Sequence, residues 1–358
     1  MIKVNSTDLS QALGFLYQGY KNGPIETILQ NVKLSLVGEV LTMTQVNEDQ
    51  ELTYSISATG DACEFTVEMK KLRDRVGQYD KDKVVSISVD SSSSKAVIKC
   101  EKSKVTLKAM PSEYFPDSRS NLSFNDVTVS GSDLKRAIGV VSRSQGNGDV
   151  RYYLNSTSFH FSGGICDVVA TDGHRLHHCV IPVDSPIEKT CLVPRDSMTP
   201  ISKFLDSGDI TVRVSENHIK ISDSESSIQT KLIDGKYPDW RRVIPKNNDI
   251  KATFNRIELA SALKGVLIVS SSKIVGLVMS IRSGEAKIYL DPKGGVESEE
   301  IVNCACQSDI EIGFNGLYLI DSIAAIESEN VDIILKDGNS SVLIKDGNYQ
   351  AVVMPMKI

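Results

Sequence analysis

The chain repeats itself three times, and this repeat limits its possible folds more than any other feature of the sequence. The three related segments are residues 4–16, 129–141 and 254–266. Each segment has a polar start, an acidic residue and then a leucine. The acidic residues lie at equal intervals of 125 residues (8 to 133 and 133 to 258): Asp8, Asp133 and Glu258. Since 358 residues suffice for two or three domains, the spacing predicts three copies of one unit.

Each repeated segment is predicted to form a short helix. A Ser or Asn before the acidic residue can cap the first turn, and the carboxylate suits the positive end of the helix dipole. Apolar residues recur at helical spacing on one face of each segment: Leu9, Leu13 and Leu16; Leu134, Ile138 and Val141; Leu259, Leu263 and Val266.

The rest of each unit predicts a second helix and antiparallel strands. The second helix follows a short strand within residues 64–76, 190–205 and 311–326. Alternating apolar and polar residues across a polar turn indicate hairpins, at residues 83–100, 209–222 and 331–346. We therefore expect an α+β fold of three repeated domains, each with two helices and antiparallel sheets, over residues 1–120, 121–248 and 249–358.

Composition is typical of a soluble globular protein, with 24% charged and 41% hydrophobic residues. We find no apolar run of signal-peptide or membrane-span length, which favours a cytoplasmic protein without membrane contact. The seven cysteines lack the spacing of a disulfide framework, so we expect reduced, mostly buried thiols. A net charge of −6 argues against a protein that coats nucleic acid by bulk electrostatics, but a locally basic surface stays possible.

Basic residues gather on the predicted helices, and this pattern has two interpretations. A face rich in Lys and Arg would hold a polyanion without sequence preference, because phosphate contacts carry no base information. The same residues could instead be ordinary solvated helix faces. The residues are Lys70, Lys71, Arg73, Arg75, Lys135, Arg136, Arg143, Arg256 and Lys264.

Five motifs, in this order, make the chain resemble the bacterial sliding clamp, the β subunit of DNA polymerase III. They are RYYLN (151–155), VATDGHRL (169–176), DGKYPDWRRVIPKN (234–247), IGFNGLYLIDSI (312–323) and VVMPMKI (352–358). The resemblance implies three domains of the DNA-clamp fold that assemble as a head-to-tail dimeric ring of six domains. It implies a processivity factor that encircles duplex DNA without sequence preference, is loaded by a separate ATP-driven clamp loader and catalyses no reaction. The chain has no GxxxxGK[ST] loop of its own.

The resemblance also implies a pocket at the junction of the second and third domains. There the family binds short partner motifs whose glutamine and apolar residues act as anchors; the partners are DNA polymerases, the clamp loader and other proteins such as ligase and mismatch-repair factors. Two groups of residues match the pocket. The first is Leu154, Thr171, Gly173, His174, Arg175, Leu176, Pro238, Val243, Val352 and Met354, and the second is Arg151, Tyr153, Asn315, Tyr318, Ser341, Pro355 and Met356.

Two further sets of residues complete the predicted sites. Those expected to contact DNA are Tyr152, Tyr153, Lys135, Arg136 and Arg195, and those expected at the dimer interface are Val105, Ile268 and Val269. Asp196 stands where some relatives have a basic residue, and the first domain matches the family mainly in its layout. Such departures fit a divergent paralogue.

The stretch TDGHRLHHC (171–179) allows a different interpretation, a metal-dependent hydrolase that uses His174, His177, His178 and Cys179. If strands flank the DGH turn, His177 and His178 point to opposite faces and only one of them can join a common site. We therefore expect no metal, no cofactor and no catalytic residue here. The sequence also allows a monomeric peptide-binding module of the same fold, and a nuclease or polymerase accessory enzyme. The accessory enzyme is disfavoured because the chain lacks clustered carboxylates at two-metal spacing.

Overall fold

The computed structural model describes residues 1–23, 27–90, 94–116, 123–205, 208–269, 276–282, 284–290, 297–306 and 308–357, with Phe204 described by its backbone alone. Contacts divide the chain into two compact units. Unit 1 contains residues 1–135 and 196–232, and unit 2 contains residues 136–195 and 233–358. The division falls inside α3 (Gly131–Val141) and after the first residue of α4 (Arg195–Phe204).

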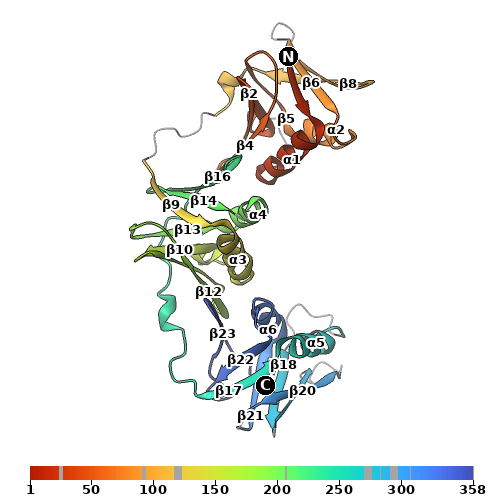
Figure 1. The fold of residues 1–358 in the computed structure, drawn as a ribbon. Helices are drawn as coiled ribbons and strands as arrows, with labels where there is room; N and C mark the ends of the chain where they lie inside the picture. Colours follow the sequence, from red (N-terminus) through yellow and green to blue (C-terminus); the bar gives the residue numbers. More distant parts are fainter. Residues whose placement is uncertain are drawn as a thin grey trace. The chain divides into compact units, whose positions relative to one another are not determined.

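Unit 1 is built on one antiparallel sheet, against which α1 (Ser6–Leu16) and α2 (Met69–Val76) lie side by side (Figure 1). The strand order in this sheet is β1 (Ile2–Asn5), β6 (Val84–Asp90), β7 (Lys95–Cys100), β8 (Ser103–Met110), β5 (Cys63–Glu68), β2 (Asn31–Val37), β3 (Val40–Val46), β4 (Gln50–Ser57), β16 (Ser226–Lys231), β15 (His218–Ser222), β14 (Asp209–Val214) and β9 (Asn125–Ser130).

Unit 2 has the same plan, with α5 (Arg256–Leu267) packed beside α6 (Gly316–Ile323). Its sheet has the order β13 (Lys189–Pro194), β10 (Ser156–Ser162), β11 (Ile165–Thr171), β12 (Arg175–Pro182), β24 (Tyr349–Val353), β23 (Val342–Asp346), β22 (Asn330–Leu335), β17 (Ile250–Asn255), β20 (Glu299–Ala305), β19 (Glu285–Leu290), β18 (Gly276–Arg282) and β21 (Ile310–Asn315).

The strands of the central repeat are shared between the two sheets. In unit 1, β16 pairs with β4 of the first repeat, with Ile228 opposite Leu52. In unit 2, β12 pairs with β24 of the third repeat, with Leu176 opposite Val352. Antiparallel pairing therefore continues from one repeat into the next, and edges that a single repeat would expose are covered.

The predicted helices and hairpins are confirmed in all three repeats. The Asn5 side chain accepts the backbone N–H of Thr7 at 2.8 Å, and Asn255 caps α5 in the same way through Ile257 and Glu258. The predicted apolar faces of α1, α3 and α5 are buried: Leu9, Leu13, Leu16, Leu134, Ile138, Val141, Leu259, Leu263 and Val266. The sequence period therefore located the helical cores correctly.

The cysteines agree with the expectation from composition. All seven cysteines are free thiols, and only Cys63 and Cys306 are not buried. None of the described helices is long and apolar enough to cross a lipid bilayer.

Candidate functional site

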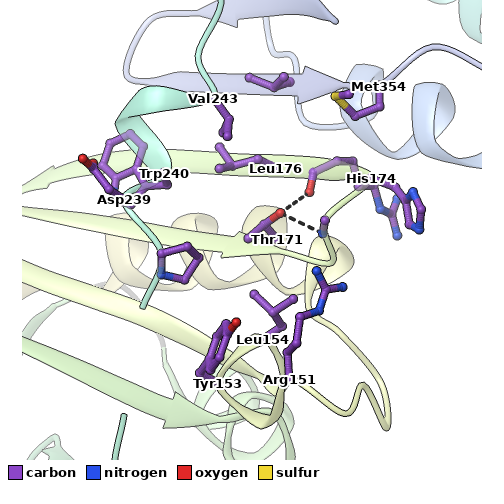
Figure 2. Close-up of a pocket in the computed structure, with 14 residues that line it drawn as sticks. Arg151, Tyr153, Leu154, Thr171, His174, Leu176, Asp239, Trp240, Val243 and Met354 are labelled. Carbon is purple, nitrogen blue, oxygen red and sulfur yellow. Dashed lines mark hydrogen bonds between the residues drawn. The ribbon is translucent and has the colours of Figure 1, made fainter. Parts of the chain in front are cut away.

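A pocket in unit 2 forms where the turn between β11 and β12 meets the end of β24 (Figure 2). The short helices η5 (Tyr152–Asn155) and η6 (Trp240–Arg242) supply further walls. The cavity has a volume of about 200 Å³. Its lining residues come from stretches far apart in the sequence: Arg151, Tyr153, Leu154, Thr171, Gly173, His174, Arg175, Leu176, Pro238, Asp239, Trp240, Val243, Val352 and Met354.

The turn of residues 171–175 is fixed by its own hydrogen bonds. The Thr171 hydroxyl donates to the Arg175 carbonyl at 2.7 Å and accepts the Gly173 N–H at 3.1 Å (Figure 2). The Asp172 carboxylate accepts the backbone N–H groups of His174 and Arg175. Gly173 has a φ of 89°, and an added Cβ would lie 3.1 Å from the Arg151 guanidinium. The backbone conformation therefore favours glycine at this position, whereas the flexible Arg151 side chain would need to move only slightly to admit a Cβ.

The base of the pocket is apolar and belongs to a buried cluster. Leu176, Val352 and Trp240 are buried there, together with Tyr237. The Tyr237 hydroxyl accepts the Thr171 N–H at 3.0 Å, which joins the loop before η6 to β11. At the rim, Val243 and Met354 are 54% and 47% exposed. The pocket therefore offers open apolar surface over a rigid base.

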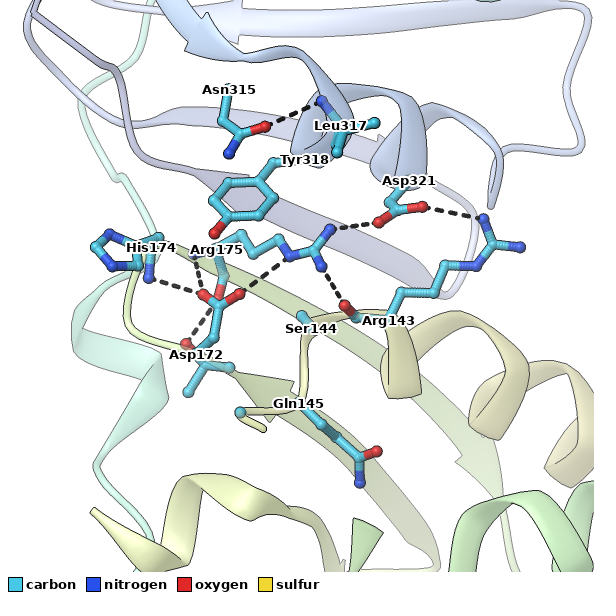
Figure 3. A network of polar contacts seen from close by, with 12 residues as sticks. Arg143, Ser144, Gln145, Asp172, His174, Arg175, Asn315, Leu317, Tyr318 and Asp321 are labelled. Carbon is cyan, nitrogen blue, oxygen red and sulfur yellow. Dashed lines mark hydrogen bonds and ion pairs between the residues drawn. The ribbon is translucent and has the colours of Figure 1, made fainter. Parts of the chain in front are cut away.

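A polar network beside the pocket joins the central repeat to α6 of the third repeat (Figure 3). The Arg175 guanidinium donates to Asp172 at 3.2 Å, to Asp321 at 2.6 Å and to the Arg143 carbonyl. It also lies 4.3 Å from the centre of the Tyr318 ring. Because only 10% of the Arg175 side chain is exposed, these contacts hold it in one position.

Arg151 forms a charged edge of the pocket. Its guanidinium donates to both oxygens of Asp149, at 3.0 and 2.8 Å. These hydrogen bonds from Arg151 lower the pKa of Asp149 to about 2, so the carboxylate is ionised at neutral pH. The pair keeps the Arg151 side chain against the Gly173 turn.

The structure brings most of the predicted pocket residues together but leaves five outside the cavity. Asn315 caps α6 by accepting the Leu317 N–H, and the Ser341 carbonyl accepts an amide N–H of Asn248. Tyr318 stacks near His174 with ring centres 6.4 Å apart, next to the cavity. The Met356 N–H donates to the Gly313 carbonyl, and Pro355 lies between Met356 and the pocket residue Met354.

Two lining residues were missing from the prediction, Asp239 and Trp240. Both lie inside the motif of residues 234–247 between two residues that were predicted, Pro238 and Val243. Their position within the motif was the signal that could have identified them.

The residues expected to contact DNA lie on different elements and have different partners. Tyr152 is 56% exposed on η5 and packs edge-on against Tyr153, a pocket residue. Lys135 is exposed on α3. Arg136 forms an ion pair with Glu327 at 2.6 Å, and Arg195 donates to the carbonyl of Gln145 at 3.0 Å. Arg136 and Arg195 thus already make contacts within unit 2.

The residues expected at a dimer interface are accessible. Ile268 and Val269, just after α5, are 83% and 47% exposed. Val105 is half-buried on β8, opposite Ile98 of β7.

The two neighbouring histidines point to opposite faces of β12, as predicted. His177 is fully buried and bonds to the Val140 carbonyl and the Ser322 hydroxyl, both at 3.0 Å. His178 bonds to Asp167 at 2.7 Å on the other face. In the described part of the chain, no three His, Cys, Asp or Glu side chains converge as metal ligands would.

Comparison with known proteins gives consistent matches along the whole chain. Family models of the DNA polymerase III β subunit match its N-terminal domain at residues 2–120, its central domain at 128–239 and its C-terminal domain at 241–357. The β sliding clamp of Pseudomonas aeruginosa is 31% identical over 341 residues, covering 92% of each chain. That of Escherichia coli is 29% identical, covering 94% of this chain and 93% of its own. A crystal structure of the P. aeruginosa clamp bound to griselimycin superimposes with a TM-score of 0.94 at 30% identity, covering 99% of both chains.

Proposed function

The chain belongs to the bacterial DNA polymerase III β-subunit family, the sliding clamps, and we propose that it is a non-catalytic processivity factor that encircles duplex DNA and tethers polymerases to it. The observation that carries the proposal is the pocket in unit 2, which assembles residues from two repeats beside β12 and β24. We assign the three clamp domains to residues 1–120, 121–248 and 249–358. Since the proposed task is on DNA, we expect the protein in the bacterial cytoplasm.

The pocket in unit 2 suits a short peptide with apolar anchors. Leu176, Val352 and Trp240 form a fixed base, while Val243 and Met354 present half-exposed apolar surface. Covering the remaining surface of each rim side chain contributes about 1 kcal/mol. The charged edge can set the direction of a bound segment. We assign the five predicted residues outside the cavity, including Tyr318 and Asn315, to a neighbouring part of the same binding surface.

A charge introduced at the pocket rim tests this assignment. We expect Val243→Glu to raise the Kd of a short synthetic peptide, which carries a glutamine and a Leu-Phe pair, by about tenfold or more, because the peptide would cover an unpaired charge. The control is Ile165→Glu, at a 40% exposed apolar residue on β11 outside the cavity. Fluorescence anisotropy measures both. Equal affinities for the two variants would remove the pocket from the proposal.

Polymerases and the clamp loader are the partners that we propose for this surface, with ligase and mismatch-repair factors as further candidates. Deletion of residues 354–358 should abolish binding of the same peptide and leave the oligomeric state unchanged. Sedimentation velocity and anisotropy on one preparation separate these effects. Unchanged peptide affinity after the deletion would contradict the placement of the site.

Two open strand edges support a head-to-tail dimer. Within the described residues, β8 pairs with β7 along its length but with β5 only at Ala109 and Met110. In the third repeat, β20 pairs with β19 over residues 299–303 and with β17 only at its end. Each strand therefore has unpaired backbone groups that a second copy can bind.

Charges on the two open edges are complementary. Lys104 and Lys108 are exposed on β8, whereas Glu297 is exposed just before β20 and Glu299 is exposed at its first residue, where it also pairs with Lys287 of β19. The exposed apolar Ile301 lies on the same strand as Glu299. Opposite charges on edges that pair would steer two copies into one head-to-tail arrangement.

A charge swap tests the dimer. Lys104→Glu with Lys108→Glu should give monomers, because carboxylates would face carboxylates. Glu297→Lys with Glu299→Lys should do the same, and mixing the two double variants should restore dimers. Sedimentation at micromolar concentration measures all three. Dimers in either variant alone, or only monomers in the mixture, would contradict this pairing.

Contact with DNA follows from the same family membership. We propose that Tyr152, Tyr153, Lys135, Arg136 and Arg195 belong to the DNA-facing surface. Arg136 and Arg195 already contact carboxylate or carbonyl oxygens, and Asp196 is an exposed acid next to Arg195. These partners leave less free positive charge for phosphate, so we expect weak, salt-sensitive and sequence-independent contacts.

A further inference from the structure

The single tryptophan of the chain forms part of the partner pocket and is supported from behind by a histidine. Trp240 is 6% exposed and lines the cavity. The ring centre of His178 lies 4.3 Å from that of Trp240, at an angle of 40°. Because the His178 side chain is itself buried, the two rings form a closed contact.

Both ring nitrogens of His178 have partners. Nε2 lies 2.7 Å from an Asp167 carboxylate oxygen, and Nδ1 lies 2.7 Å from the side-chain amide nitrogen of Gln350. A neutral ring that donates from Nε2 and accepts at Nδ1 satisfies both contacts. The ring is therefore held in one orientation by β11 on one side and β24 on the other.

The Asp167 carboxylate also binds the second side chain that packs on the indole, Arg241. The second oxygen of Asp167 accepts a hydrogen bond from the Arg241 guanidinium, which lies 4.4 Å from the centre of the Trp240 ring. Burial raises the pKa of Asp167, but the hydrogen bond from His178 and the charge of Arg241 outweigh it, so the pKa is lowered and the carboxylate is ionised. Trp240 thus contacts His178 and Arg241, and Asp167 joins the two.

The backbone around Trp240 depends on these side chains. In η6 the described backbone hydrogen bonds are local, from Arg242 to Asp239 and from Val243 to Trp240. No described backbone bond joins residues 239–243 to a strand of the sheet. Side-chain contacts, those of Trp240 among them, therefore hold this wall of the pocket in place.

We propose that His178 and Asp167 are positioning residues for the partner pocket, which fix the Trp240 indole and thereby set which apolar anchor of a partner peptide fits against it. This inference rests on the proposed function of the pocket. Neither residue lines the cavity, so each acts through Trp240. The ligand is a short peptide with a large apolar side chain at its anchor position.

The test measures peptide affinity and tryptophan emission in the full-length protein. We expect His178→Ala to shift Trp240 emission to longer wavelength and to raise the Kd of the Leu-Phe peptide about two- to tenfold, the range that one aromatic contact is worth. The preference for that peptide over one with valine in place of phenylalanine should fall. Asp167→Asn keeps the volume of the side chain and removes the charge that holds Arg241. It should cause smaller changes of the same kind in emission, in Kd and in peptide preference.

The matched control is His177→Ala. His177 is the neighbouring buried histidine on the opposite face of β12, and its described partners do not include Trp240. It should lower stability but leave emission and anchor preference as in the wild type. If the His178→Ala variant does not fold, the Asp167→Asn variant tests the positioning role instead.

Each outcome has one meaning. Wild-type protein that does not bind the peptide would refute the proposed function of the pocket. Wild-type binding with unchanged anchor preference and unchanged emission in both His178→Ala and Asp167→Asn would refute the positioning role alone. Equal changes in the His177 and His178 variants would show a merely structural effect and also overturn the role.

Discussion

His177 should make the stability of unit 2 depend on pH. Its side chain is fully buried between β12, α3 and α6, where it bonds to the Val140 carbonyl and the Ser322 hydroxyl. Burial, more than any other cause, lowers the pKa of His177 to about 4; the hydrogen bond to Val140 opposes this and the charge of Arg175 adds to it. An unfolded histidine titrates near 6.5.

The size and sign of the effect follow from these two pKa values. Between pH 6.5 and 4 the unfolded chain binds a proton at this position and the folded protein does not, so acid favours unfolding. Each pH unit below 6.5 lowers the free energy of unfolding by about 1.4 kcal/mol. The loss is roughly 2 kcal/mol at pH 5 and approaches a limit of roughly 3 kcal/mol near pH 4. The contribution of the neutral His177 to the free energy of unfolding is therefore fully present above pH 6.5 and is lost as the pH falls.

The assay is urea unfolding at pH 7.5 and pH 5, followed by the emission of Trp240, which lies in the same unit. Other groups also titrate, so the informative quantity is the difference between the wild type and His177→Asn, whose amide can still donate to the Val140 carbonyl. The wild type should lose roughly 2 kcal/mol more than the variant on acidification. An equal loss in both proteins would refute a buried neutral histidine.

Further predictions concern the polar network and two glycines. Asp321→Asn removes a charged partner of Arg175, so it should lower the free energy of unfolding by about 1–3 kcal/mol and weaken peptide binding. Urea titration measures the stability and anisotropy measures the binding. Unchanged values would show that Asp172 alone suffices to hold Arg175. Gly338→Ala should lower stability by about 1–3 kcal/mol, because the new Cβ would lie 2.4 Å from the Glu311 carbonyl oxygen. Gly139→Ala, on α3 with no atom within 4 Å of the new Cβ, should raise stability by about 0.5–1 kcal/mol. Thermal unfolding of both glycine variants measures the contrast, and shifts of the same sign would contradict it.

The sequence predicted the elements of the fold well because their signals are local. The cap at Asn5 and the buried face of Leu9, Leu13 and Leu16 can be recognised within one helix. The continuation of each sheet into the next repeat could not be predicted in this way. Pairing of Ile228 with Leu52, or of Leu176 with Val352, joins segments far apart in the chain and leaves no periodic signal in either.

The candidate site shows the same division. The resemblance named most of the residues that line the cavity in unit 2, and strand alternation placed His177 and His178 on opposite faces. Neither the resemblance nor the strand alternation indicated that His178 would contact Asp167 and Trp240, because these contacts need β11, β12 and η6 in their folded positions.

Retention on circular DNA tests the central proposal most directly. The protein is loaded onto a nicked circle with a clamp loader and ATP, separated from free protein, and followed before and after a single cut linearises the DNA. A closed ring should stay on the circle and slide off the linear molecule. Equal loss from circular and linear DNA would contradict encirclement.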